Sequence, residues 1–170
     1  MIENKWNIKD RAKEMNKIIM LFTEGTVFGP KNILGFYFHT KYIPIGNCRQ
    51  KIRAWDEQGA EIVYITSRKT EKQVDEIRDL LKRYDFPDGR LYYRDRKQKY
   101  KDIVEEIMPN ILIEDDCRSI GGRWQMCITY VNPELKEKIQ SIVVKEFKGI
   151  DHLPDKFGAL SAYNSNEKEG

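Results

Sequence analysis

The sequence predicts an α/β fold, built on a doubly wound parallel sheet with helices on both faces. Residues 18–22 form an apolar run without polar alternation, which is typical of a central strand buried on both sides. Further short apolar runs alternate along the chain with segments of helical periodicity, and this alternation predicts a parallel sheet. Small polar loops follow these runs, at the edge where open α/β sheets bind their ligands.

The length and composition indicate the broad class of protein. With 170 residues the chain fits a single domain, expected over residues 1–155, with a flexible polar tail at 156–170. The 30 Lys and Arg against 27 Asp and Glu give a net charge of +3, too balanced to indicate nucleic acid from charge alone. The three cysteines lack CxxC spacing, which favours a reducing, cytoplasmic setting. No apolar stretch approaches the roughly 20 residues of a membrane span.

The elements before and after the first strand are read from their patterns. Residues 1–17 are polar and predict a short helix or arm at the edge of the domain. Residues 27–44 are rich in aromatics, glycine and proline, which predicts a hairpin or flap, and not a helix. Residues 45–58 carry an apolar stripe at helical spacing, and Gly59 ends that helix. The second strand is predicted at residues 61–65.

The middle of the chain contains the clearest helix signal. Thr70 and Gln73 form a capping box, and periodic apolar residues follow them, so a helix begins there. A third strand is predicted at residues 91–93. The next helix covers residues 100–108 and ends at Pro109, which cannot continue it.

The last third of the chain completes the predicted sheet. The fourth strand is expected at residues 111–113 and a fifth at residues 127–131. A short helix at 134–140 and an edge strand at 141–147 follow. The stretch 146–154 contains no motif with a chemical mechanism.

Polar side chains gather at the predicted ends of three strands. They are Thr23, Glu24 and Thr26 after the first, Thr66, Ser67 and Arg68 after the second, and Glu114, Asp115 and Asp116 after the fourth. Clustered carboxylates suit Mg²⁺, which prefers oxygen ligands. Hydroxyls, amides at helix starts and a lysine suit a phosphoryl group. Each feature also has a structural interpretation, as a solvated turn, a helix cap or surface charge.

The order and spacing of these segments resemble the haloacid dehalogenase superfamily of phosphohydrolases. In that family the first strand ends in Asp-x-Asp-Gly-Thr, the second in Thr or Ser, and the fourth in an acidic pair, with a lysine before it. Residues 63–68 (VYITSR) match the second signature, and residues 111–116 (ILIEDD) match the acidic one. Lys99 best matches the lysine, with Lys101 as the alternative. The resemblance covers residues 18–131 and implies a small flap without a large cap domain.

The resemblance implies phosphoryl transfer assisted by Mg²⁺, with the following site. The catalytic positions would be Glu24, Thr66 and Lys99; phosphate would contact Thr26, Thr66, Ser67 and Lys99; and Glu114, Asp115 and Asp116 would hold the metal.

The chain departs from this family at the first signature. Gly25 and Thr26 align with Gly-Thr, so Glu24 falls on the aspartate that acts as general acid and base. Phe22 then falls on the nucleophile, where a phenyl ring can neither attack phosphorus nor bind Mg²⁺.

Three hypotheses follow from this departure. The first is a domain without conventional phosphatase activity, which binds a phosphorylated small molecule or a protein partner. The second is an active Mg²⁺-dependent phosphatase or nucleotidase with an unusual first loop, in which water or Thr23 attacks. The third is a nucleic-acid module, suggested by the basic and tyrosine-containing residues 92–101, for which a solvated helix start is the simpler interpretation.

Overall fold

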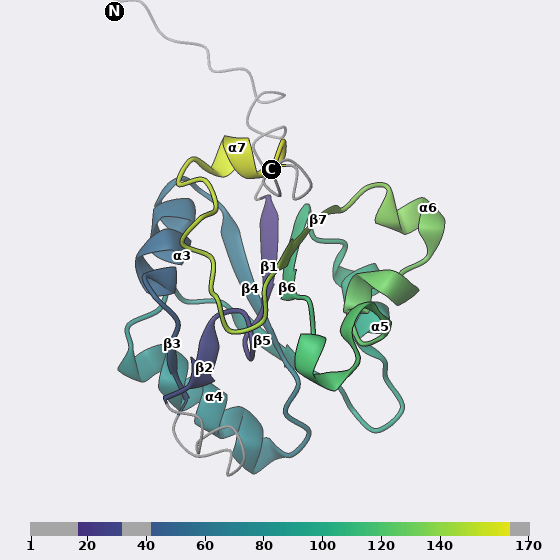
Figure 1. The fold of residues 1–170 in the computed structure, drawn as a ribbon, viewed down its shortest axis with the longest axis horizontal. Coiled ribbons are helices and arrows are strands. Elements are labelled where there is room, and N and C mark those ends of the chain that lie inside the picture. Colours follow the sequence, from purple (N-terminus) through teal and green to yellow (C-terminus); the bar gives the residue numbers. More distant parts are fainter. Residues whose placement is uncertain (1–16, 32–41, 164–170) are drawn as a thin grey trace, which may run out of the picture.

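A five-stranded parallel sheet forms the centre of the molecule (Figure 1). The computed structural model describes residues 17–31 and 42–163. The strands lie in the order β5-β4-β1-β6-β7, and every neighbouring pair is parallel. Their bounds are β1 Ile18–Phe22, β4 Glu61–Thr66, β5 Arg90–Tyr93, β6 Ile111–Asp115 and β7 Gln140–Val144. The predicted α/β class and its parallel sheet are confirmed, as a Rossmann-like arrangement.

Helices and a small hairpin surround this sheet (Figure 1). The helices are α3 Cys48–Glu57, α4 Glu71–Arg83, α5 Tyr100–Ile107, α6 Pro133–Lys136 and α7 Phe157–Leu160. Three short 3₁₀ turns follow β6: η1 Arg118–Ile120, η2 Gly122–Trp124 and η3 Cys127–Tyr130. The antiparallel strands β2 Phe28–Pro30 and β3 Tyr42–Pro44 form the base of the predicted flap. The connection between them, and residues 1–16 of the predicted arm, lie outside the described residues.

The apolar run of β1 serves two separate cores, one on each face of the sheet. Ile19 and Leu21 pack into the core that contains Trp55 of α3, whereas Met20 packs into the core that contains Val104 of α5. All five side chains are fully buried. Helices α3 and α5 accordingly lie on opposite sides of the sheet (Figure 1). The absence of polar alternation in β1 therefore reflects burial on both faces.

The strand order brings the polar loops to one edge of the sheet. The chain adds β4 and β5 on one side of β1, then returns to add β6 and β7 on the other side. The backbone amide of Thr23 donates to the carbonyl of Ile65 at 2.9 Å, and that of Asp116 donates to Val144 at 2.8 Å. The ends of β1 and β4, and those of β6 and β7, are thus tied together at the position where such sheets bind ligands.

Two predicted segments differ from the structure. Residues 127–131, expected as a strand, contain the 3₁₀ turn η3. The amides of Cys127 and Ile128 donate hydrogen bonds to the buried carboxylate of Glu114, so they are not available to pair with a neighbouring strand. The fifth strand is instead β7, which pairs with β6 and coincides with the predicted edge strand. Part of the expected flexible tail forms α7, whose Leu160 is fully buried. Residues 164–170 lie outside the described part of the chain.

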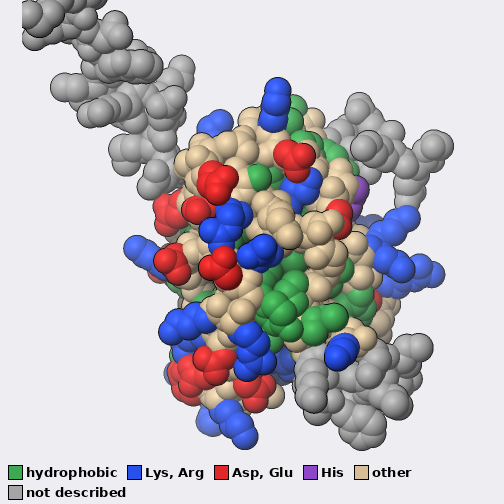
Figure 2. Space-filling model, turned by 90° about the vertical axis from the view of Figure 1, so that its left-hand side faces the viewer, with side chains coloured by type: hydrophobic (Ala, Val, Ile, Leu, Met, Phe, Trp, Pro, Cys, Tyr) green, Lys and Arg blue, Asp and Glu red, His purple; other side chains and the backbone are tan. Residues whose placement is uncertain are grey.

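The surface on the α3 side carries charges of both signs. Figure 2 shows lysine, arginine and acidic side chains interspersed there, around a small hydrophobic area. Such mixing produces no extended field of one sign on this face. Among the described residues, no helix combines the length and apolar character that crossing a membrane requires.

Candidate functional site

The loop after β1 is a tight turn that lies against β6. The backbone amides of Val27 and Phe28 both donate to the carbonyl of Thr23, at 2.9 and 2.8 Å. Gly25 has φ +82°, and a Cβ atom there would lie 2.5 Å from Oδ1 of Asp115. Only glycine combines this conformation with so close an approach, so the turn and the Asp115 carboxylate form one packed unit.

The Glu24 carboxylate lies at the centre of a hydrogen-bonded network. Its Oε1 accepts from the Thr66 hydroxyl at 2.6 Å and lies 3.1 Å from Nε of Arg68. Its Oε2 accepts from the Thr23 hydroxyl at 2.6 Å and from the backbone amide of Ser67 at 3.1 Å. The Glu24 and Arg68 side chains are only 13% and 12% exposed. The structure thus brings Glu24, Thr66 and Ser67 together, with the donors pointing at a carboxylate.

Arg68 links this network to the hairpin. Its guanidinium lies 5.1 Å from the centre of the Tyr42 ring on β3. Burial raises the pKa of Tyr42, which the positive charge of Arg68 partly opposes. Tyr42 is therefore a neutral phenol beside the site. Its position next to Arg68 depends on the folded hairpin and could not be predicted from the sequence.

Phe22, at the nucleophile position of the resemblance, packs in an aromatic stack. Its ring meets that of Tyr100 edge to face, with 5.4 Å between centroids. The guanidinium of Arg94 covers the Tyr100 ring at 4.1 Å. Burial raises the pKa of Tyr100, so this phenol also stays neutral. Apolar packing therefore occupies position 22 at this end of β1, where the resemblance places the nucleophile.

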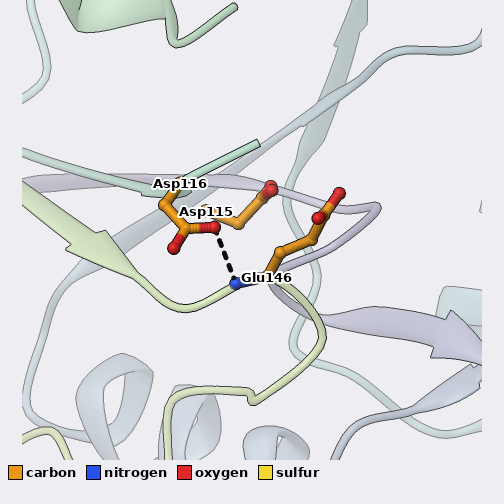
Figure 3. A group of neighbouring side chains, drawn as sticks. All are labelled: Asp115, Asp116 and Glu146. Atoms are coloured by element: carbon orange, nitrogen blue, oxygen red, sulfur yellow. Dashed lines mark hydrogen bonds between the residues drawn. The ribbon is translucent and has the colours of Figure 1, made fainter. Parts of the chain in front are cut away.

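Three carboxylates come together at the ends of β6 and β7 (Figure 3). One oxygen each from Asp115, Asp116 and Glu146 lies within 4.8 Å of the others. Asp115 accepts from the Cys117 amide at 3.0 Å, Asp116 accepts from the Glu146 amide at 3.1 Å, and Glu146 accepts from Ser119. Burial raises the pKa of Asp115, and the neighbouring Glu146 and Asp116 charges raise it further.

Glu114, predicted as a metal ligand, does not join this cluster. Its side chain is 2% exposed and accepts from the amides of Cys127 and Ile128 at 2.6 and 2.9 Å. Burial raises the pKa of Glu114 to about 7. Neighbouring residues of a strand point to opposite faces, so Glu114 and Asp115 face different surroundings. Glu146 takes the third place in the cluster, and no sequence motif identified it.

The remaining predicted residues are not among the hydrogen-bond partners of Glu24 in the described part of the chain. Lys99 is exposed and lines a surface pocket with Tyr100, immediately before α5. Lys101, the alternative to Lys99, forms ion pairs with Asp102 and Glu105, both at 3.4 Å. Thr26 is fully buried, and its hydroxyl has no hydrogen-bond partner among the described residues.

The five-stranded parallel sheet with polar strand ends defines a Rossmann-like α/β protein. The chain is similar to a chain in the solved structure of the Pnkp1/Rnl/Hen1 RNA repair complex, with TM-score 0.51 and 13% identity over 76% of this chain and 43% of that one. A second structure of the Pnkp1/Rnl/Hen1 complex gives TM-score 0.50 and 13% identity over 78% and 48%. A scan of protein-family models and a search of curated proteins find no match.

This similarity concerns the fold alone. The chain spans less than half the length of the chains that it matches. The site is therefore interpreted from its own residues.

Proposed function

We propose that the strand-end site binds the phosphoryl group of a small molecule or protein partner and has no conventional phosphatase activity. The observation that carries this proposal is the pairing of two features at the end of β1. Phe22 packs edge to face on Tyr100 at the position where the phosphohydrolases that the sequence resembles carry a nucleophile, and Thr66 and Ser67 donate to the Glu24 carboxylate nearby. The site therefore has hydrogen-bond donors suited to an anion, but position 22 offers no oxygen atom for covalent attack on phosphorus.

The Glu24 carboxylate is an internal anion within this site. Carboxylate and phosphoryl oxygens accept the same charge-assisted hydrogen bonds from hydroxyl, amide and guanidinium donors. A phosphoryl ligand would displace Glu24, take over the donors of Thr66 and Ser67, and form an ion pair with Arg68 in place of Glu24. Two anions side by side repel each other, so Glu24 limits the affinity of the site for phosphate.

The acidic cluster fits a divalent cation in this proposal. Asp115, Asp116 and Glu146 offer carboxylate oxygens, which Mg²⁺ prefers, and a bound cation would offset the burial that raises the pKa of Asp115. These three residues would hold the ion, with Glu146 in place of Glu114. Bound there, Mg²⁺ would neutralise part of the charge on a phosphoryl oxygen.

Calorimetric titration with inorganic phosphate tests the role of Glu24. Glu24→Gln keeps the shape of the side chain and removes its charge, so it should tighten phosphate binding about fivefold, because a like charge about 4 Å away costs ~1 kcal/mol even in water. Thr66→Val removes a donor and should weaken binding. Glu76→Gln removes an exposed charge from α4 and should leave binding unchanged. Weaker phosphate binding by Glu24→Gln, or none by any variant, would contradict the proposal.

An active Mg²⁺-dependent phosphatase is the second candidate, and one contact favours it. The Thr23 hydroxyl donates to Glu24 at 2.6 Å, which is the geometry of a nucleophile beside a base. Thr23 is fully buried, however, so a substrate would have to open the loop to reach it. This candidate requires turnover of a phosphate ester that is lost in both Thr23→Val and Asp115→Asn.

A further inference from the structure

A separate pocket of about 390 Å³ lies beside α5, on the surface of the molecule. Its lining includes Arg94, Lys99, Tyr100, Trp124, Met126 and Tyr130. Trp124 and Tyr130 are 64% and 54% exposed, and with Ile120 they are the exposed large hydrophobic residues of the described chain. Tryptophan and tyrosine rings left in water beside a pocket are typical of binding sites.

The two exposed rings are held in place by the loop that carries them. The Tyr130 hydroxyl donates to the carbonyl of Trp124 at 2.7 Å, and the Thr129 hydroxyl donates to that of Arg123 at 2.6 Å. The buried carboxylate of Glu114 anchors the start of η3 beneath them. A ligand would therefore meet rings whose backbone is already ordered, which lowers the entropy cost of binding.

Positive charges surround these rings. The Arg123 guanidinium lies 5.2 Å from the centre of the Trp124 ring, and Arg94 covers Tyr100 at 4.1 Å. The Nε atom of Arg94 is buried without a hydrogen-bond partner among the described residues. Lys99 lines the same pocket and is exposed. Aromatic faces alternating with cations suit a ligand that carries both flat rings and negative charge.

We propose that this pocket binds a nucleobase of single-stranded nucleic acid. A base would stack on Trp124 or Tyr130, and the flanking phosphates would contact Arg94, Lys99 and Arg123. A single strand fits because its base faces are open to stacking, whereas a duplex buries them. The cations around the pocket favour a polyanion over a second copy of this chain, whose net charge is nearly balanced.

The balanced net charge of the chain did not indicate such a ligand, because a net charge does not show where the charged side chains lie on the surface. The fold brings the basic residues before α5 next to the rings of η2 and η3, which come from a different stretch of the chain. Tyr100 lines the pocket and also packs on Phe22, so the pocket borders the proposed phosphoryl site. The inference goes beyond that proposed function and does not depend on it, since base binding needs neither Mg²⁺ nor turnover.

Fluorescence anisotropy with a labelled oligouridylate of about 12 nucleotides, without metal, tests the inference on the full chain. Trp124→Leu keeps an apolar side chain but loses the stacking face, and should weaken binding by about fivefold or more. Trp124→Phe keeps a ring and should bind nearly as well as wild type. Lys99→Ala should weaken binding and reduce its salt dependence, whereas Lys72→Ala on α4, also an exposed lysine, should change neither.

Several results would overturn the inference. The inference fails if wild type shows no binding at low salt, or if Trp124→Leu binds like wild type while its circular dichroism remains native. If uridine monophosphate competes as well as the oligonucleotide at equal nucleotide concentration, the pocket is a mononucleotide site. If wild type sediments as a dimer and Trp124→Leu as a monomer, the pocket is an interface between two copies of the chain.

Discussion

Replacing Glu114 with glutamine should remove a pH dependence of stability that this buried carboxyl imposes. The Glu114 side chain is 2% exposed, and its oxygens accept from the amides of Cys127 and Ile128. Burial raises its pKa from 4.5 to about 7, because removal from water penalises the charged form more than the two amide donors stabilise it. Glutamine has nearly the same shape and keeps one oxygen, which accepts from one of these two amides, and it does not ionise.

The direction and size of the effect follow from this pKa. Between pH 4.5 and about 7 the folded chain holds a proton that the unfolded chain has released, so the free energy of unfolding falls as pH rises. The contribution of Glu114 to stability is complete below its pKa in the unfolded chain, and it is lost once the pH rises above its pKa in the folded chain. A rise of this size corresponds to about 3 kcal/mol, at ~1.4 kcal/mol for each pH unit.

Urea unfolding at about pH 5 and about pH 8, followed by circular dichroism, measures this difference. Wild type should lose about 2.5 kcal/mol more than Glu114→Gln between the two pH values, because pH 5 lies slightly above the pKa of the unfolded chain. Glu106→Gln on α5 removes an exposed carboxylate and should behave like wild type. The reasoning is refuted if wild type and Glu114→Gln lose stability in parallel, because the buried carboxyl would then titrate normally.

Two further substitutions test the packing that holds the site. Gly25→Ala should lower the free energy of unfolding by about 2 kcal/mol or more, because its Cβ would collide with Asp115 at φ +82°. Gly59→Ala, at φ +91° with nothing within 4 Å, should cost only about 1 kcal/mol, so equal losses in urea unfolding would exclude the collision. Trp55→Ala should lower the free energy of unfolding by about 3–5 kcal/mol, because Trp55 is fully buried and donates a hydrogen bond to the carbonyl of Pro154. A loss under about 1 kcal/mol would contradict its role in the core.

The central sheet could be predicted from the sequence because local pattern determines it. The apolar runs at β1 and β4 are long enough to distinguish buried strands, and Thr70 marks the start of α4 by accepting from the amide of Gln73. The convergence of Glu24 with Thr66 could also be anticipated, because parallel strands end at one edge.

The rest depends on contacts between distant segments. Cys127 and Ile128 have the β-branched and apolar character of a strand, and only the approach of Glu114 turns their backbone into η3. Glu146 enters the acidic cluster through the pairing of β7 with β6, which local sequence does not encode. Lys99 carries the expected residue type, but its side chain faces a pocket beside the predicted site.

Phosphate release from a panel of phosphate esters, with and without Mg²⁺, tests most directly whether Phe22 has replaced the nucleophile of a phosphatase site. Wild type and Phe22→Asp should be assayed together, with circular dichroism to show that the new carboxylate leaves the fold intact. The proposed function predicts no release by wild type and Mg²⁺-dependent release by Phe22→Asp, since the substitution supplies an oxygen at the position where the resemblance places the nucleophile. Release by wild type, lost in Asp115→Asn, would contradict it and show that another group attacks phosphorus.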